Sequence, residues 1–156
     1  MMSYPIGSYE DYEVLNEPWL KFKLSDGSLL RFKVVLVEVL KTGQYDQYGR
    51  PVYGLATTNV ISIRAPKELK GEPTIPPPSS QELGASIVEE VKITPINQHD
   101  NNSYSLDDGT TVTINVLVTS VKRTNKYAFL GEPLYLIDSQ NIPKFDVPQS
   151  LWKHQL

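Results

Sequence analysis

The chain has no cysteine, only two histidines, and no apolar run of the length that a membrane helix needs. Without cysteine, disulfides, thiolate metal sites and cysteine nucleophiles are excluded. His99 and His154 stand far apart in the sequence, so no metal-ligand spacing is present. A helix that crosses a bilayer takes about 18 or more consecutive apolar residues. We therefore predict a protein with no metal, no cofactor and no membrane segment.

The chain also has no large excess of charge of either sign: the net charge is −3 and the isoelectric point is near 5.4. No overall basic surface is available to attract nucleic acid or an anionic membrane. The first residues, MMSYPIGSYEDYE, lack the basic and apolar regions of a secretory signal. We expect a cytoplasmic protein. Its 12 prolines and 2 methionines favour heat adaptation.

The sequence contains one long internal repeat. Shifted by 82 positions, residues 22–66 align with residues 104–148 without a gap, and 12 of the 45 positions are identical. Average residue usage gives about 3 identities by chance. The stretch KTGQYDQYGRPVY, Lys41–Tyr53, returns as RTNKYAFLGEPLY, Arg123–Tyr135. We interpret the chain as a tandem duplication of a unit of about 60 residues.

The repeat divides the chain into three parts. Residues 1–66 form a first β repeat, residues 67–84 a linker, and residues 85–156 a second β repeat. The linker contains Pro73 and the triplet Pro76–Pro78. Because proline favours an extended backbone, we expect a semi-rigid spacer. A proline motif for a partner domain is the alternative.

Each unit contains a predicted hairpin. Asp26-Gly27 and Asp108-Gly109 both stand between runs of alternating apolar residues. This pattern is typical of a two-residue type I′ turn, with positive φ at both central residues. In the strand after the first turn, the apolar residues change from even to odd positions after Val34, and the second copy does the same. The change predicts a β-bulge or bend, or else a strand buried on both faces.

The fold class follows from these strands and from the lack of any long helical periodicity. We predict an all-β protein, or a β-rich α+β protein, with a proline that closes each unit. The units form curved antiparallel sheets or small barrels with pseudo-twofold symmetry. The sequence leaves open whether they make one pseudo-symmetric domain or two.

No motif for catalysis is present, and we predict no catalytic residue. Asp108 already belongs to a predicted turn, and the pair Glu89-Glu90 stands in a strand-like segment where one neighbour faces solvent. No glycine-rich phosphate loop or nucleophile elbow accompanies these carboxylates. A small enzyme with a carboxylate site between the repeats remains an alternative.

Aromatic and basic residues alternate in the repeated stretch, which makes it the candidate binding site. The predicted binding residues are Tyr45, Tyr48, Arg50, Arg123, Lys126 and Tyr127. Aromatic rings with interleaved basic residues stack bases and hold phosphates in single-strand binders. Tyrosine and arginine are also enriched in protein interfaces. A third interpretation places the tyrosines as plugs over the bent strand.

The Asp-Gly hairpin, the bent strand and the basic-Thr…Tyr…Gly-x-Pro-x-Tyr run together resemble small archaeal β-rich proteins that carry one such unit. The resemblance covers Leu24–Pro66 and Leu106–Pro148. It implies a cytoplasmic archaeal protein and brings no activity or catalytic residues. Copy two has Ala128 and Leu130 where copy one has Asp46 and Tyr48, which counts against a shared polar site.

These observations favour a non-enzymatic binding or scaffold protein with a protein partner or a homo-oligomeric state, because long strands expose edges that pair. The alternative is a single-stranded nucleic-acid-binding module that uses the tyrosine and basic loops.

Overall fold

The computed structural model describes residues 7–97 and 100–153, and its strands form two five-stranded antiparallel sheets. His99 and His154 lie outside the described residues. The first sheet contains β1 (Ser8–Tyr9), β3 (Leu20–Leu24), β4 (Leu29–Tyr45), β5 (Pro51–Arg64) and β7 (Ile93–Pro95). The second contains β2 (Tyr12–Asn16), β6 (Ile87–Val91), β8 (Asn102–Leu106), β9 (Thr111–Tyr127) and β10 (Pro133–Asp146).

The expected β-rich fold is confirmed. The described helical elements are α1 (Ser80–Gly84) and two 3-10 turns, Lys67–Leu69 and Gln149–Leu151. Ser79 caps α1 by accepting a hydrogen bond from the Glu82 N–H. None of the helical elements in residues 7–97 and 100–153 has the length and apolar character to cross a membrane.

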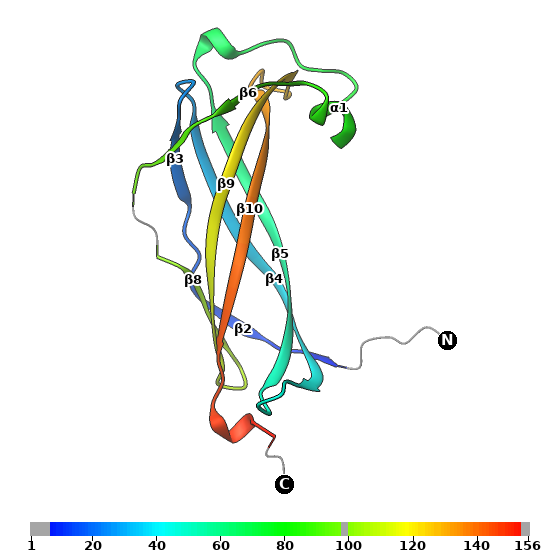
Figure 1. Ribbon diagram of the computed structural model, residues 1–156, viewed down its shortest axis with the longest axis vertical. Helices are drawn as coiled ribbons and strands as arrows, with labels where there is room; N and C mark the ends of the chain where they lie inside the picture. Colours follow the sequence, from blue (N-terminus) through cyan, green and yellow to red (C-terminus); the bar gives the residue numbers. More distant parts are fainter. Residues whose placement is uncertain (1–6, 98–99, 154–156) are drawn as a thin grey trace, which may run out of the picture.

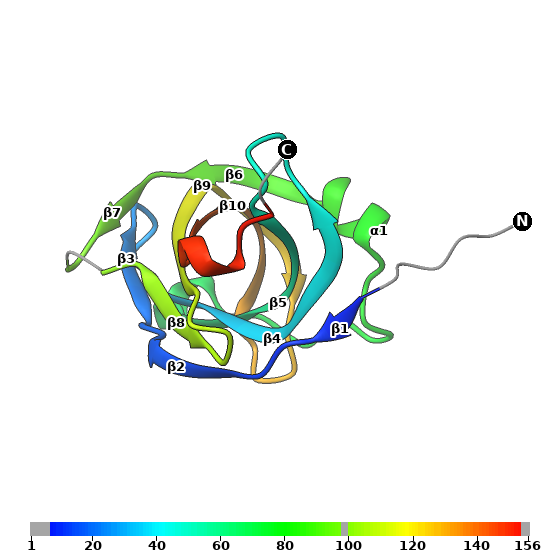
Figure 2. The same ribbon diagram turned by 90° about the horizontal axis from the view of Figure 1, so that it is seen from below.

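Two long hairpins, β4–β5 and β9–β10, run along the long axis of the molecule (Figure 1). Seen down this axis, the strands of the two sheets surround a shared interior (Figure 2). The β4–β5 loop lies at the end that also holds the turn Gln149–Leu151, whereas the β9–β10 loop lies at the opposite end, near α1 (Figure 1). The two loops are therefore separated by the length of the molecule.

Short strands cross between the two halves of the chain. β2 comes directly before β3 in the sequence, yet it pairs with β8, with Tyr12 opposite Leu106. Reciprocally, β7 comes before β8 and pairs with β3, with Ile93 opposite Leu24. By contrast, β1 and β6 pair with the long strands of their own halves. Each sheet is therefore completed by a strand from the other half.

Both long hairpins contain a register shift, which confirms the predicted irregularity. In β4–β5 the register shifts between Leu36 and Glu38, so that Val37 is the extra residue. In β9–β10 the extra residue is Thr119, which stands 82 positions after Val37. The bulge comes later than the apolar pattern indicated, because Leu36 is still buried and burial resumes at Val39. A strand buried on both faces is excluded, because Val37 is 53% exposed.

Both Asp-Gly hairpins are present, but the predicted type I′ turn is wrong. Gly27 has a φ of 91°, and no non-glycine residue in the described part of the chain has a positive φ. A type I′ turn needs a positive φ at the aspartate as well. The loop instead has three residues closed by the Gly27 N–H on the Leu24 carbonyl, with glycine in the left-handed position. The Asp26 carboxylate accepts the Ser28 N–H at 2.9 Å, which keeps the aspartate out of the left-handed region.

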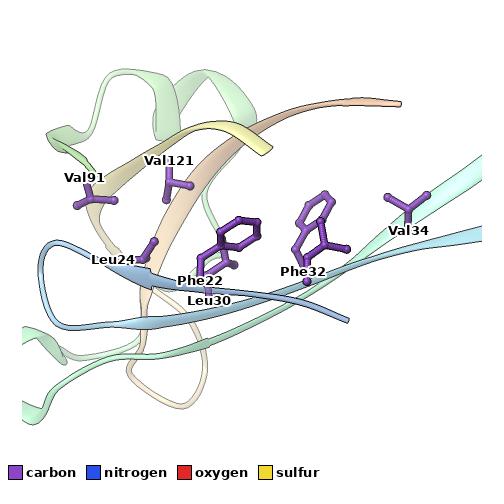
Figure 3. Close-up of a cluster of buried hydrophobic side chains, with 8 residues drawn as sticks. Phe22, Leu24, Leu30, Phe32, Val34, Val91 and Val121 are labelled. Carbon is purple, nitrogen blue, oxygen red and sulfur yellow. The ribbon is translucent and has the colours of Figure 1, made fainter. Parts of the chain in front are cut away.

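The core consists of two clusters of buried apolar side chains, and both halves of the chain contribute to each. In the first cluster, side chains of β3 and β4 point toward Val91 of β6 and Val121 of β9 (Figure 3). The second cluster is centred on β8 and β9 and includes Leu36 and Val39 of β4. Val116 packs against both clusters. The long strand β4 therefore supplies apolar side chains to both clusters.

These pairings predict that the two halves stay together without the peptide connection. Replacing Pro76–Pro78 by a protease site and cleaving the folded protein should give two fragments that co-elute in equal amounts. The reason is that the β2–β8 and β3–β7 pairings and both core clusters join the halves noncovalently. Size-exclusion chromatography of the cleaved protein, with and without urea, measures this. Separation of the fragments in plain buffer would contradict it.

Candidate functional site

The six predicted binding residues do not come together in one place. Tyr45, Tyr48 and Arg50 stand at or beside the β4–β5 loop, whereas the other three stand on the far part of β9. These two regions lie at opposite ends of the long axis (Figure 1). Any binding site made from them is therefore two separate sites, which we describe in turn.

At the end formed by the β4–β5 loop, aromatic and basic side chains lie close together. The Asp46 carboxylate holds the loop by accepting hydrogen bonds from the Arg50 side chain and from the Tyr48 N–H, at 2.8 and 2.9 Å. The Arg50 guanidinium then lies 5.0 Å from the centre of the Tyr48 ring and 5.9 Å from that of Trp152. Lys153 lies 5.6 Å from the Tyr45 ring. We call these five residues, Tyr45, Tyr48, Arg50, Trp152 and Lys153, the aromatic–basic cluster.

The C-terminal segment completes this cluster through backbone contact. The Lys153 N–H donates to the Gly49 carbonyl at 2.7 Å, and Gly49 has a φ of 85°. A side chain at Gly49 would collide with the Lys153 backbone. Trp152 and Lys153 were not predicted as site residues, because nothing in the sequence indicates which loop the C-terminal segment reaches.

At the opposite end, the predicted residues are engaged in holding the fold. The Arg123 side chain is 17% exposed and forms ion pairs with Asp26 and Glu89, both at 3.1 Å. The Tyr127 carbonyl accepts a hydrogen bond from the Thr74 N–H of the linker, and the Tyr127 N–H donates to the Thr74 hydroxyl, both at 3.0 Å. Its ring covers Gly71, where an added Cβ would lie 2.6 Å from the ring. Lys126 is half-buried beside them.

The most elaborate polar arrangement joins the Asp26 turn to β9 and β10. The Tyr135 hydroxyl donates to Asp26 Oδ2 at 2.6 Å and lies 2.9 Å from the Ser28 hydroxyl. Arg123 binds the same carboxylate oxygen. The Asp26 side chain is only 3% exposed, so its charge depends on these donors.

A second arrangement joins the Asp108 turn to β4 and β5 in the same way. The Tyr53 hydroxyl donates to Asp108 Oδ2 at 2.5 Å and lies 3.0 Å from the Thr110 hydroxyl. Lys41 binds the same carboxylate oxygen at 3.1 Å. The four groups stand 82 positions from Arg123, Tyr135, Asp26 and Ser28. We call the two arrangements the aspartate–tyrosine clamps.

The clamps shift the pKa of their members in opposite directions. Burial acts to raise the pKa of Asp26, but hydrogen bonds from Tyr135, Ser28 and Arg123 outweigh it, and the pKa lies below its ordinary value. The pKa of Asp108 is lowered in the same manner. Burial, followed by the hydrogen bond to the aspartate, raises the pKa of Tyr53 and of Tyr135.

These shifts oppose proton-transfer chemistry. A general base works best with a pKa near the operating pH, whereas each clamp holds an ionised carboxylate against a neutral phenol. Among residues 7–97 and 100–153, no group of three or more acidic, histidine or cysteine side chains is placed to hold a metal ion. The clamps therefore act as structural connections between the two halves.

The sequence indicated the members of the clamps but not their pairing. The sequence places the two aspartates in Asp-Gly turns and the two tyrosines at corresponding ends of the repeated stretch. Their common signal was identity at the 82-residue spacing, which Lys41 and Arg123 share as a conservative pair. That spacing gives no direct sign that each aspartate meets the tyrosine of the other half.

A pocket lies beside each long-hairpin loop. One pocket of about 510 Å³ lies between the β9–β10 loop and the end of β5, and its lining includes Ile61, Ile63, Phe129 and Leu130. The other, about 340 Å³, lies between the β4–β5 loop and the end of β10, and its lining includes Asp46, Arg50 and Lys144. The first is mainly apolar at its rim, because Phe129 is 87% exposed and Leu130 is 79% exposed.

No protein-family model, curated protein or solved structure matches the chain.

The first clamp prediction concerns stability. Tyr135→Phe and Tyr53→Phe should each lower the free energy of unfolding by about 1.5–3 kcal/mol, because each removes a hydrogen bond to a buried charge. Urea unfolding measures this change. Tyr127→Phe is the matched control, because none of the described residues accepts a hydrogen bond from its hydroxyl, and it should change little. Equal effects of all three substitutions would contradict the clamp.

The second clamp prediction concerns pH. Because the folded-state pKa values of Asp26 and Asp108 are lowered, their contribution is fully present above the unfolded-state pKa of about 4 and is lost as the pH falls below it. The urea midpoint of the wild type should therefore fall on acidification below about pH 4. The double variant Asp26→Asn, Asp108→Asn should start lower at neutral pH and fall less. Parallel curves for the two proteins would show that the clamps carry no such linkage.

Proposed function

We propose that the protein is a non-enzymatic binding or scaffold protein built from two homologous β units with pseudo-twofold symmetry. Corresponding elements support this proposal: β4 and β9 both have 17 residues, and β5 and β10 both have 14. The bulges, the clamps and the two 3-10 turns all recur at the 82-residue spacing. Such regular recurrence is what a tandem duplication produces.

The units correspond to residues 1–66 and 85–156, joined by the linker 67–84. One correspondence extends the unit into the linker. The Gly71 N–H donates to the Gly131 carbonyl, just as the Lys153 N–H donates to the Gly49 carbonyl. The segment after β5 thus closes the β9–β10 loop, and the segment after β10 closes the β4–β5 loop. On this interpretation the last segment of each unit packs on the long-hairpin loop of the other unit.

A binding role is favoured because the polar residues of the repeat are already engaged. In each clamp the buried aspartate accepts a hydrogen bond from the tyrosine, and Arg123 forms ion pairs with two carboxylates. Few of these groups are free to act on a substrate. The exposed apolar side chains at the β9–β10 loop suit a binding surface better than a catalytic site.

One observation carries the proposal: Phe129 and Leu130 are 87% and 79% exposed at the rim of the pocket of about 510 Å³. Large apolar side chains that gather at a concave surface mark a binding site more often than an ordinary surface. Leu134, Ile61 and Ile63 continue the same surface into the pocket. We call these five residues the apolar patch, and we propose that it binds an apolar segment of a protein partner.

The aromatic–basic cluster favours a second candidate, a single-stranded nucleic acid. Tyr48 is 63% exposed and Arg50 lies over its ring, an arrangement that suits base stacking beside a phosphate. The net charge of −3 opposes this candidate. The corresponding loop in the other half carries Phe129 and Leu130 and has no basic residue between Ala128 and Glu132.

A photo-reactive amino acid placed at position 129 or at position 48 of the full-length protein tests both candidates. Irradiation in native lysate should cross-link one protein species at position 129, with loss of that species in a Leu130→Asp variant, because a charge at the rim opposes apolar contact. The cross-linked species are separated and identified by mass spectrometry.

The position-48 arm is the internal control. Cross-linking of nucleic acid at position 48, together with salt-sensitive retention on a single-stranded DNA column, would favour the second candidate. Equal, unselective cross-linking at both positions would contradict the apolar patch as a binding site.

A further inference from the structure

The outer edge of β5 is free along its whole length in the described structure. β4 pairs with β5 on one side and with β3 and β1 on the other, whereas β5 pairs with β4 alone. Six successive residues, Ala56 to Ile61, are exposed, so neither face of the strand is covered there. An edge strand of this kind presents a row of unpaired N–H and C=O groups.

In β5 the proline and the charged residue stand only at the two ends, at Pro51 and Arg64. From Pro51 to Ile63 the strand PVYGLATTNVISI contains no charged residue, and its exposed part is rich in β-branched side chains. Proteins usually protect long edges with charges, prolines or covering elements. The side-chain hydrogen bond that links the exposed stretch to another sheet is the one from Asn141 to Thr57, at 3.4 Å.

The corresponding edge of β10 carries charged residues and a proline. β10 contains Asp138, Pro143 and Lys144 in the same part of the strand. The helix α1 also lies against β9 and β10. The two edges therefore differ although the strands have equal length and the same pairing with their neighbours.

We propose that two copies of the chain pair through their β5 edges, antiparallel about a twofold axis, which joins two five-stranded sheets into one continuous sheet. A pairing centred on Asn59 places Thr58 opposite Val60 and Thr57 opposite Ile61 of the other copy. No like charges meet, because the stretch is uncharged, and β-branched residues make favourable cross-strand pairs.

A second copy fits this edge better than a charged ligand does. The edge offers backbone hydrogen bonds and neutral side chains, with no countercharge for a phosphate or an acidic peptide. An antiparallel pair of identical strands is self-complementary, so pairing of β5 with β5 gives a closed dimer rather than a fibre. This pairing goes beyond the proposed binding role of the apolar patch: it is centred on Asn59, which does not line that pocket, and the two surfaces share Ile61 at the end of the paired stretch.

Sedimentation equilibrium of the full-length protein tests the proposal. The wild type should have twice the 17.6 kDa chain mass at micromolar concentration and above. Asn59→Lys should weaken the dimer at least about tenfold, because like charges then stand directly opposite one another. The control is Gln140→Lys, an exposed neutral residue on β10, which should leave the dimer unchanged. A monomeric wild type, or equal weakening by both variants, would overturn the proposal.

Because the chain has no cysteine, a single introduced cysteine gives an independent measurement. Asn59→Cys should form a disulfide between copies on mild oxidation, since the two residues face each other across the twofold axis. Gln140→Cys, on β10, should stay monomeric on a non-reducing gel under the same oxidation. Equal cross-linking by the two variants would exclude the β5 edge as the interface. If the protein is monomeric but still cross-links a partner at position 129, the proposed β5 pairing fails while the proposed role of the apolar patch stands.

Discussion

The structure depends on the bond between a turn aspartate in one half and a strand tyrosine in the other. Each aspartate follows directly from local geometry, because its carboxylate accepts the N–H two residues later and so fixes the Asp-Gly turn. The second carboxylate oxygen then points toward the opposite half, where a tyrosine hydroxyl and a basic side chain meet it. A charge buried to this extent is stable only when all of these donors are present. The clamp thus couples the fold of each turn to the docking of the other half.

This coupling explains why the repeated stretch contains both a basic residue and a tyrosine. Lys41 and Tyr53 stand 12 positions apart on neighbouring strands of one hairpin and are directly paired in the register of β4 and β5. Arg123 and Tyr135 pair in the same way in β9 and β10. The loop between them sets that register. Thr42 and Thr124 support it, since each donates its hydroxyl to a carbonyl on the partner strand at 2.8 Å. The loop residues are therefore needed to bring two side chains onto one carboxylate.

The sequence predicted the local parts of this arrangement and not the exchange between halves. Asp-Gly turns, alternating strands and the change of apolar phase depend on neighbouring residues, so they can be read from a single segment. The pairing of β2 with β8 joins residues about 90 positions apart, and nothing in the residues around Tyr12 indicates that this strand pairs with β8 rather than with β3.

The predicted turn type was wrong for a related reason. The aspartate has a negative φ, and its carboxylate binds groups of the other half. The turn propensity of the Asp-Gly pair does not include those groups. Of the six predicted binding residues, Arg123 and Tyr127 were predicted because basic and aromatic side chains are common in binding sites. In the fold, both are instead engaged in contacts within the chain.

The differences between the two halves show where the chain can take on a new role. Positions in the clamps and turns keep the same chemistry in both halves, because a change in either breaks the connection. The loops and edges outside the clamps have diverged: Arg50 corresponds to Glu132, Tyr48 to Leu130, and the uncharged edge of β5 to the charged edge of β10. As a result, one end presents aromatic and basic groups and the other an apolar patch. The two halves therefore carry different surfaces, and the proposed partner contact and the proposed self-pairing both lie outside the clamps.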